Sequence, residues 1–178
     1  SSGKQGYAIA ETLQSLGAKT TLVSGPTSLA EPNVEQVIKV NSADQMLEAC
    51  ESSLPADIAV CAAAVADYKI ANKEIAKIKK DGSRQNMILE ENPDILERLS
   101  KRNHLRPKLV VGFAAETSNL ERNSDEKLSK KGCDWVLGNN VSENSIFNQD
   151  TNKIYFTSKL YSENWELMTK KEVAKKLC

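Results

Sequence analysis

Residues 57–80 read DIAVCAAAVADYKIANKEIAKIKK and join an apolar run of small residues to a carboxylate and a cluster of lysines. The Val, Ile, Ala and Cys residues of 57–66 are typical of a strand that is buried on both faces, as in a parallel sheet. Asp67 follows this run directly, at the end of the strand where open parallel sheets bind their ligands. The stretch therefore predicts a core strand that leads into a site.

Helical and strand-like patterns alternate on both sides of this stretch. Gly17 and Gly132 mark helix ends, and Ser42 and Thr169 are typical helix caps. Residues 68–84 are polar and rich in lysine, which is typical of a lid, a binding loop or a disordered segment. The expected helices cover 6–16, 43–53, a segment opened by Asn92-Pro93-Asp94 with Pro in its first turn, 119–131 and the residues after Thr169. The expected strands cover 20–23, 34–40, 57–66, 86–90, 109–113 and 135–137, with 154–156 and 165–168 paired as a hairpin.

This order predicts a single α/β domain over residues 1–178: a Rossmann-like three-layer sandwich with a mostly parallel sheet and a C-terminal β-hairpin. The chain begins SSGKQG and enters a helix directly. A nucleotide-binding unit of this class has a strand before its Gly-rich turn. We therefore expect the N-terminal strand to be missing from the sheet.

The composition excludes several classes of protein. The 24 Lys and Arg residues equal the 24 Asp and Glu residues, so no overall field attracts nucleic acid or an anionic membrane. No apolar stretch approaches the roughly 18 to 20 residues of a membrane span, and no signal peptide is visible. Four single cysteines and one histidine, His104 in a polar loop, argue against a zinc site and favour a reduced, cytoplasmic protein.

Chemistry must then depend on Lys, Asp, Asn and backbone N–H groups, which position and stabilise charge. The lysines of KIKK, which begins at Lys77, suit a phosphorylated ligand, although such runs are also common on solvated surfaces. Lys127 and Lys131 lie four apart on one helix face and could grip a polyphosphate, or could simply complement the helix dipole. The SSGKQG turn offers N–H groups to an anion but matches neither the P-loop nor the GxGxxG spacing.

Taken in order, SSGKQG, TLVSGP, AAVADYK, KIKK, ENPDI, RPKLVVGFAAET, KLSKKGCDW and NNVS resemble phosphopantothenoylcysteine synthetase. In most bacteria this synthetase is the domain fused behind a flavin-dependent decarboxylase. The resemblance covers essentially the whole chain. It implies a homodimer that activates 4'-phosphopantothenate with CTP and Mg²⁺, releases pyrophosphate, and then joins the acyl group to L-cysteine with release of CMP. FMN would belong only to the upstream decarboxylase domain.

The resemblance also implies roles for single residues. Lys77 becomes the candidate catalytic residue and a phosphate contact, and Lys127 and Lys131 become further phosphate contacts. The remaining nucleotide contacts are implied at Ser1, Ser2, Gly3, Ala63, Ala64, Asp67, Asn92, Pro93, Asp94, Ile95 and Phe113. No metal ligands are assigned.

The sequence departs from the family at its start, because the Gly-rich strand and a functionally important Asn upstream of the SSGK turn are absent. We therefore expect the chain to be the C-terminal part of a longer bifunctional protein. Two alternatives stay open. One is a Rossmann-type NAD(P)-dependent reductase, although it would need a strand followed by GxGxxG and a later acid. The other is a nucleotide-binding module without catalytic activity.

Overall fold

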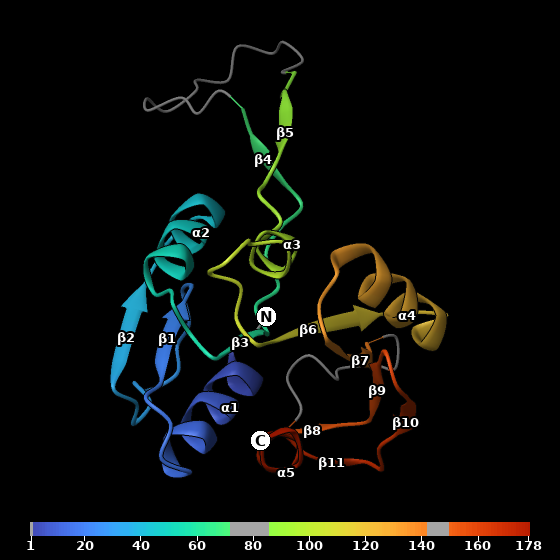
Figure 1. Ribbon diagram of the computed structural model, residues 1–178. Helices are drawn as coiled ribbons and strands as arrows, with labels where there is room; N and C mark the ends of the chain where they lie inside the picture. Colours follow the sequence, from blue (N-terminus) through green and yellow to red (C-terminus); the bar gives the residue numbers. More distant parts are fainter. Residues whose placement is uncertain (1, 72–85, 142–149) are drawn as a thin grey trace.

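A five-stranded sheet forms the centre of the molecule, with the strand order β10 (Ser162–Asn164), β9 (Ile154–Ser158), β7 (Trp135–Asn140), β6 (Leu109–Glu116) and β3 (Ile58–Cys61). The computed structural model describes residues 2–71, 86–141 and 150–178 (Figure 1). The strands β3, β6 and β7 are parallel, and β9 and β10 are antiparallel to their neighbours. This architecture confirms the expected α/β fold with a largely parallel sheet.

Helices cover both faces of this sheet (Figure 1). One face carries α3 (Ile95–Ser100) and α4 (Leu120–Lys131), and the other carries α1 (Lys4–Ser15) and α5 (Lys170–Leu177). The expected signals delimit them: Gly132 ends α4 with a φ of 71°, and Thr169 begins α5 with a complete capping box. Of the described helices, none is long and apolar enough to cross a membrane.

The apolar side chains of β6 and β7 alternate between two cores. Val110 and Val136 pack with Leu96 and Leu128 from α3 and α4, whereas Leu137 packs on the opposite face. Val110, Val136 and Leu137 are 0% exposed. Because side chains alternate along a strand, consecutive residues of β6 pack into the cores on opposite faces of the sheet. The strand β6 is therefore packed on both of its faces.

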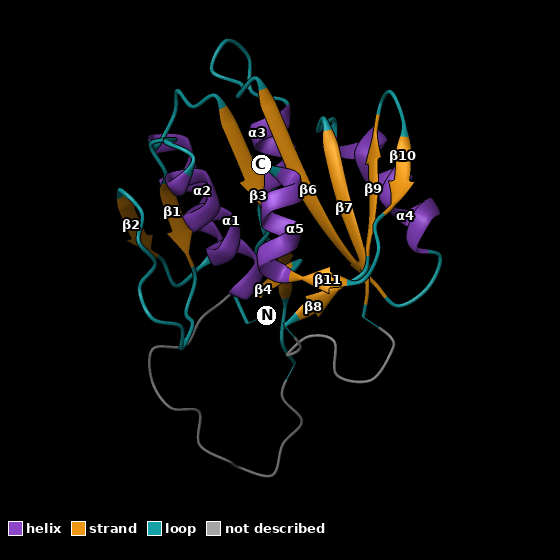
Figure 2. Ribbon diagram, turned by 90° about the horizontal axis from the view of Figure 1, so that it is seen from below, coloured by secondary structure: helices purple, strands orange, loops and turns teal. Residues whose placement is uncertain are grey.

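A second, smaller sheet lies beyond β3, on the side away from β6 (Figure 2). It consists of the parallel strands β1 (Thr21–Ser24) and β2 (Gln36–Lys39), and α2 (Ala43–Ser52) follows them. Among the described residues, β1 pairs only with β2, and β3 pairs only with β6. Each of these strands thus keeps one edge without a strand partner in the described chain.

Two short antiparallel pairs complete the structure. The strands β4 (Tyr68–Ile70) and β5 (Leu89–Glu91) form a ribbon that extends away from α3 (Figure 1). The strands β8 (Thr151–Asn152) and β11 (Met168–Thr169) pair beside the start of α5. The ribbon shows that the polar stretch expected to be a loop begins with a strand.

Three local expectations were wrong. The strand expected over 57–66 ends at Cys61, and its Ile58 is 45% exposed, because one edge of β3 has no partner in the described chain. The strand that pairs with β9 is formed by the polar residues 162–164 of β10 and not by 165–168, and of the latter only Trp165 reaches β9, with its N–H donating to the Ile154 carbonyl at 2.8 Å. Pro93 lies before the cap Asp94 and not in the first turn of α3.

Candidate functional site

The loop that enters α3 is fixed to the segment after β3. The backbone N–H of Asn92 donates to the Asp67 carbonyl at 2.8 Å, and its side-chain Nδ2 donates to the Ala66 carbonyl at 2.9 Å. Asp67 itself does not end β3 but follows it after residues 62–66. Two predicted nucleotide contacts, 25 positions apart in the sequence, are thus brought into direct contact.

Asp94 links the start of α3 to the end of α4. Its side chain accepts a hydrogen bond from the Glu97 N–H at 2.8 Å, and its Oδ2 lies 2.5 Å from Lys131 Nζ. Burial raises the pKa of Asp94, but the hydrogen bonds from Lys131 and from the Glu97 N–H lower it more, so the pKa lies below its ordinary value. The Lys131 pKa is raised, first by its hydrogen bond to Asp94. Both groups are therefore held in their charged forms.

Lys127 lies one turn before Lys131 on the same face of α4. Its Nζ donates to the Phe113 carbonyl of β6 at 2.6 Å. The Phe113 side chain packs against the core formed with α1 and α5. The backbone carbonyl of Phe113, and not its side chain, therefore lies beside the lysines of α4.

A third side chain continues this row towards the start of α4. Asn123 is four residues before Lys127, and its Nδ2 donates to Glu116 Oε2 at 2.7 Å and to the Ser118 carbonyl at 3.2 Å. We call Asn123, Lys127 and Lys131 the α4 row. The prediction from the sequence included only the two lysines, although the same spacing of four reaches Asn123.

The other predicted contacts occupy several places. Ala63 and Ala64 are exposed in the loop after β3, next to Ala62, whose Cβ lies 3.7 Å from the position a Cβ would have at Gly6 of α1. Gly3 begins α1 with a φ of 75°, a conformation that favours glycine. The start of α1, with Ser2, therefore adjoins the alanine loop, while Ile95 is buried in α3. Ser1 and Lys77 lie outside the described residues.

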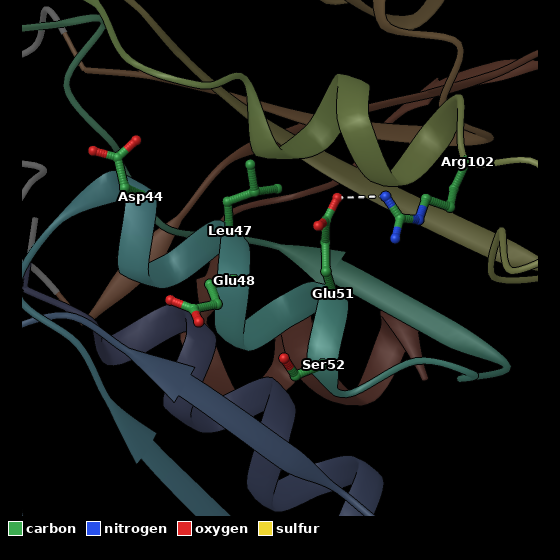
Figure 3. Close-up of a pocket in the computed structure, with 6 residues that line it drawn as sticks. All are labelled: Asp44, Leu47, Glu48, Glu51, Ser52 and Arg102. Carbon is green, nitrogen blue, oxygen red and sulfur yellow. Dashed lines mark hydrogen bonds and ion pairs between the residues drawn. The ribbon is translucent and has the colours of Figure 1, made fainter.

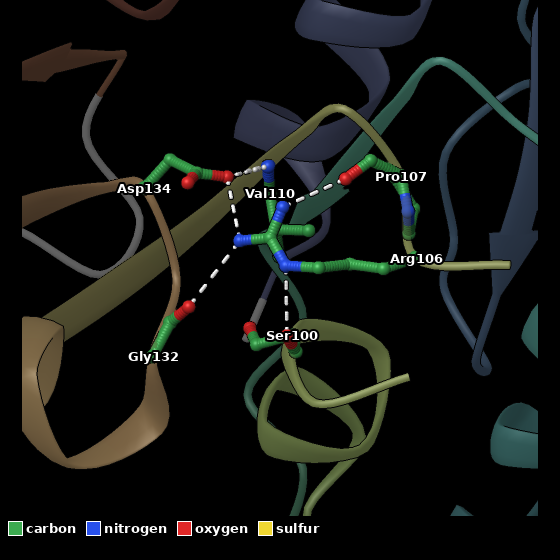
Figure 4. A network of polar contacts seen from close by, with 6 residues as sticks. All are labelled: Ser100, Arg106, Pro107, Val110, Gly132 and Asp134. Atoms are coloured by element: carbon green, nitrogen blue, oxygen red, sulfur yellow. Dashed lines mark hydrogen bonds and ion pairs between the residues drawn. The ribbon is translucent and has the colours of Figure 1, made fainter. Parts of the chain in front are cut away.

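Arg106 holds the other end of α3 to the end of α4 (Figure 4). Its guanidinium donates to the carbonyls of Ser100 and Pro107 at 2.8 Å and to that of Gly132 at 3.3 Å, and it pairs with Asp134 at 2.9 Å. Asp134 Oδ2 also accepts the Val110 N–H at 2.7 Å. This clamp fixes the two helices that carry Asp94 and Lys131.

A surface depression of about 470 Å³ lies between α2 and the end of α3 (Figure 3). Asp44, Glu48 and Glu51 line it, and Glu51 pairs with Arg102 at 2.6 Å. None of the predicted nucleotide contacts borders it. An acidic surface repels phosphate, so we place the candidate site on the α3 and α4 face of β6.

The cysteines contribute no reactive thiol to this site. All four are free, and Cys133 is 0% exposed. Burial raises the pKa of Cys50 to about 11, and it also raises that of Cys133. Thiols with raised pKa values are poor nucleophiles at neutral pH, and the buried Cys133 acts as a small residue of the core.

Known proteins are similar to this chain in sequence and in fold. The family model described as the DNA/pantothenate metabolism flavoprotein C-terminal domain matches residues 1–178. The coenzyme A biosynthesis bifunctional protein CoaBC of Haemophilus influenzae is 39% identical over 175 residues, which are 98% of this chain and 44% of that protein. CoaBC of Escherichia coli is 39% identical over 160 residues, 87% of this chain and 39% of that protein. The chain spans less than half the length of these relatives.

Solved structures agree with the sequence relatives. The crystal structure of the C-terminal domain of a CoaBC protein superimposes with a TM-score of 0.79 at 35% identity and covers 99% of this chain and 80% of that one. A Cab2 mutant in complex with phosphopantothenate-cysteine has the same fold, with a TM-score of 0.72 at 14% identity over 99% of this chain and 77% of that one. From the match over its full length, the chain belongs to the family of DNA/pantothenate metabolism flavoprotein C-terminal domains.

Proposed function

We propose that the chain is a phosphopantothenate–cysteine ligase of coenzyme A biosynthesis. Its substrates would be 4'-phosphopantothenate, L-cysteine and CTP, and it would act in the cytoplasm. The observation that carries the proposal is the convergence of Asp94, Lys127 and Lys131 on the α3 and α4 face of β6. The names of the relatives support it, since they are proteins of coenzyme A biosynthesis.

The reaction needs two successive displacements. A carboxylate oxygen of phosphopantothenate attacks the α-phosphorus of CTP, and the bond to the leaving pyrophosphate breaks. The neutral amine of cysteine then attacks the acyl carbon, and the C–O bond to CMP breaks with its electron pair on the phosphate. Neither step requires a nucleophile from the protein, so the raised thiol pKa values are no obstacle.

The protein would contribute charge and position. Lys127 and Lys131 offer two ammonium groups from one helix face, and Asn92 fixes the loop that carries Asp67. Lysines aimed at phosphates stabilise the negative charge that builds up when pyrophosphate leaves. We propose the same role for Lys77. The remaining contacts inferred from the resemblance would bind the nucleotide, with Ala63 and Ala64 against its base: Ser1, Ser2, Gly3, Ala63, Ala64, Pro93, Ile95 and Phe113.

Mg²⁺ fits this site as a partner of the nucleotide. Within the described ranges, no group of three or more His, Cys, Asp or Glu side chains could hold a metal ion. Mg²⁺ commonly binds to one or two carboxylates and to substrate phosphates, where it neutralises phosphate charge. The carboxylate of Asp67 is exposed beside the loop that enters α3 and is the residue that would meet such an ion. No flavin chemistry enters the proposal.

We also propose that the protein is a homodimer that pairs through the β4–β5 ribbon. One face of the ribbon carries Tyr68, Ile70 and Leu89, which are 55%, 41% and 57% exposed, with Glu91 opposite Tyr68 at its edge. The opposite face carries Lys69, which pairs with Asp44 of α2 at 2.6 Å. An isolated two-stranded ribbon is marginal in water, so a second copy covering the apolar face would stabilise it.

The ligase proposal is tested in the complete natural protein. Pyrophosphate release should require phosphopantothenate, CTP and Mg²⁺ together, and breakdown of CTP that is indifferent to phosphopantothenate would contradict the proposal. Thermal stabilisation by CTP but not by NADPH would separate it from a reductase. Lys77→Gln should reduce turnover severely without lowering the melting temperature, and normal turnover would exclude Lys77 from catalysis.

The dimer is tested by light scattering. Ile70→Glu should convert a dimer into a monomer, because it places two charges in the buried interface. The control is Leu160→Glu, at a side chain that is 92% exposed on the β9–β10 turn. A dimer that survives Ile70→Glu would exclude this ribbon as the interface.

A further inference from the structure

The partners of the side chains in the α4 row differ along its length. Lys131 pairs with Asp94, Lys127 donates to a backbone carbonyl, and Asn123 donates to the carboxylate of Glu116. Successive members are four residues apart, which is about 6 Å along a helix. Two ammonium groups are thus followed, one turn further towards the carboxyl end of β6, by a single anchored carboxylate.

Glu116 is held in a defined position. It is the last residue of β6, lies opposite Asn140 of β7 in the ladder, and is partly exposed. Asn123 donates to its Oε2, and the same amide also holds the Ser118 carbonyl, so the carboxylate and the following turn are fixed together. In the described part of the chain, no side chain donates to the other oxygen, Oε1.

The carboxylate also has no cationic partner of its own among the described residues. Asp94 and Glu97, at the other end of the row, differ in this respect, since Asp94 pairs with Lys131 and Glu97 pairs with Lys101. A charged group that is oriented by an amide and has one oxygen available is suited to a ligand of opposite charge. It lies at the carboxyl ends of the central strands, where ligands of open α/β sheets bind.

We propose that Glu116 binds the ammonium group of the amine co-substrate and so determines specificity for an amino acid. This assignment rests on the ligase function proposed above. The polarity of the row fits it: Lys127 and Lys131 face the phosphates, and the acyl carbon between phosphate and amine falls towards Glu116. The ammonium first gives one proton to solvent, and the neutral nitrogen then forms the bond to the acyl carbon. As the C–O bond breaks and CMP leaves with its electron pair, the nitrogen gives a second proton to solvent and becomes the amide.

The test separates the two halves of the reaction in the complete natural protein. Glu116→Gln keeps the shape and the acceptor for Asn123 but removes the charge. We expect pyrophosphate release without cysteine at an unchanged rate, and a KM for cysteine raised at least about tenfold, since a hydrogen bond between charged groups is lost. Glu126→Gln, an exposed carboxylate of α4 paired with Arg122, is the matched control and should change neither quantity.

Hydroxylamine provides a second readout, because it is uncharged at neutral pH and traps activated acyl groups. Its rate should be equal in the Glu116→Gln variant and in the unchanged protein, which a variant with a damaged fold could not achieve. An unchanged KM for cysteine, an impaired first step, or an altered Mg²⁺ requirement would overturn the assignment of Glu116 alone. Absence of pyrophosphate release in the unchanged protein would overturn the proposed function and this assignment with it.

Discussion

The central strands β6 and β7 and the strands β1, β2 and β3 differ in how fully their backbones are paired. β6 and β7 have a strand on each edge, and their Val110, Val136 and Leu137 are 0% exposed. In the described part of the chain, β1 and β2 pair only with each other, and β3, which faces them, has an Ile58 that is 45% exposed. Burial of the apolar side chains in these strands therefore depends on pairing along both edges and not on apolar sequence alone.

This contrast divides the candidate site into two parts. Glu116 and the α4 row rest on the doubly paired strands, and Arg106 clamps the helices that carry them. The alanine loop after β3 and the start of α1 rest on the singly paired part. We therefore expect the charged groups to be rigid and the part that would contact the base to depend more on its surroundings.

The largest effect should come from a glycine beneath α4. A Cβ at Gly138 would lie 2.3 Å from Ser124 Oγ and 2.8 Å from Leu120 Cδ1, so Gly138→Ala should lower the free energy of unfolding by about 3 kcal/mol. Gly25 follows β1, and a Cβ there would meet only Met46 Cε, at 3.9 Å. Gly25→Ala should therefore change stability little in urea unfolding. Equal effects of the two substitutions would refute the contrast.

A smaller effect is expected from the clamp. Arg106→Gln removes the ion pair with Asp134 and most of the hydrogen-bond donors that hold the ends of α3 and α4. The free energy of unfolding should fall by about 2 kcal/mol. The control is Arg122→Gln, at an exposed residue of α4 whose partner is Glu126 one turn away. Urea unfolding measures both variants. If the loss is no greater for Arg106→Gln than for the control, α3 and α4 do not depend on the clamp.

Hydrogen exchange compares the singly paired strand β1 with the doubly paired strand β7 directly. The amides of β1 should exchange at least about tenfold faster than those of β7, which is about 1.4 kcal/mol in the free energy of opening. Mass spectrometry of peptides covering Thr21–Ser24 and Trp135–Asn140 measures this difference. Equal protection of both peptides would show that the single pairing of β1 does not weaken it.

The sequence was sufficient for elements with a local signal. Gly17, Ser42, Gly132 and Thr169 begin or end helices as predicted, because each acts through the backbone of its own turn. The length of β6 was not predictable beyond Phe113. Its last three residues are held by the ladder with β7, and no local pattern indicates that pairing. The polar strand β10 was missed because only its pairing with β9 makes it a strand.

The site was predictable in its residues but not in its contacts. The resemblance indicated Asp94, Lys127 and Lys131, yet the pair of Asp94 and Lys131 joins residues 37 positions apart. Such a contact depends on the packing of α3 beside α4 and leaves no trace in local spacing. Asn123 could have been found from its interval of four to Lys127, but its acceptor Glu116 follows only from the end of β6.

The smallest expected effect is the acid sensitivity of the Asp94–Lys131 pair. The folded pKa of Asp94 lies below the ordinary value, so ionised Asp94 stabilises the fold above its unfolded pKa of about 3.9, and this stability is lost as the pH falls through the folded pKa. The pair is partly exposed, so its contribution should stay below about 1 kcal/mol. In the Lys131→Met variant, burial still raises the pKa of Asp94, and the main group left to lower it is the Glu97 N–H. The pKa of Asp94 should therefore rise. Acid unfolding should then begin at a higher pH than in the control Lys130→Met, at an exposed neighbour, and identical acid transitions would show that Lys131 does not hold Asp94 ionised.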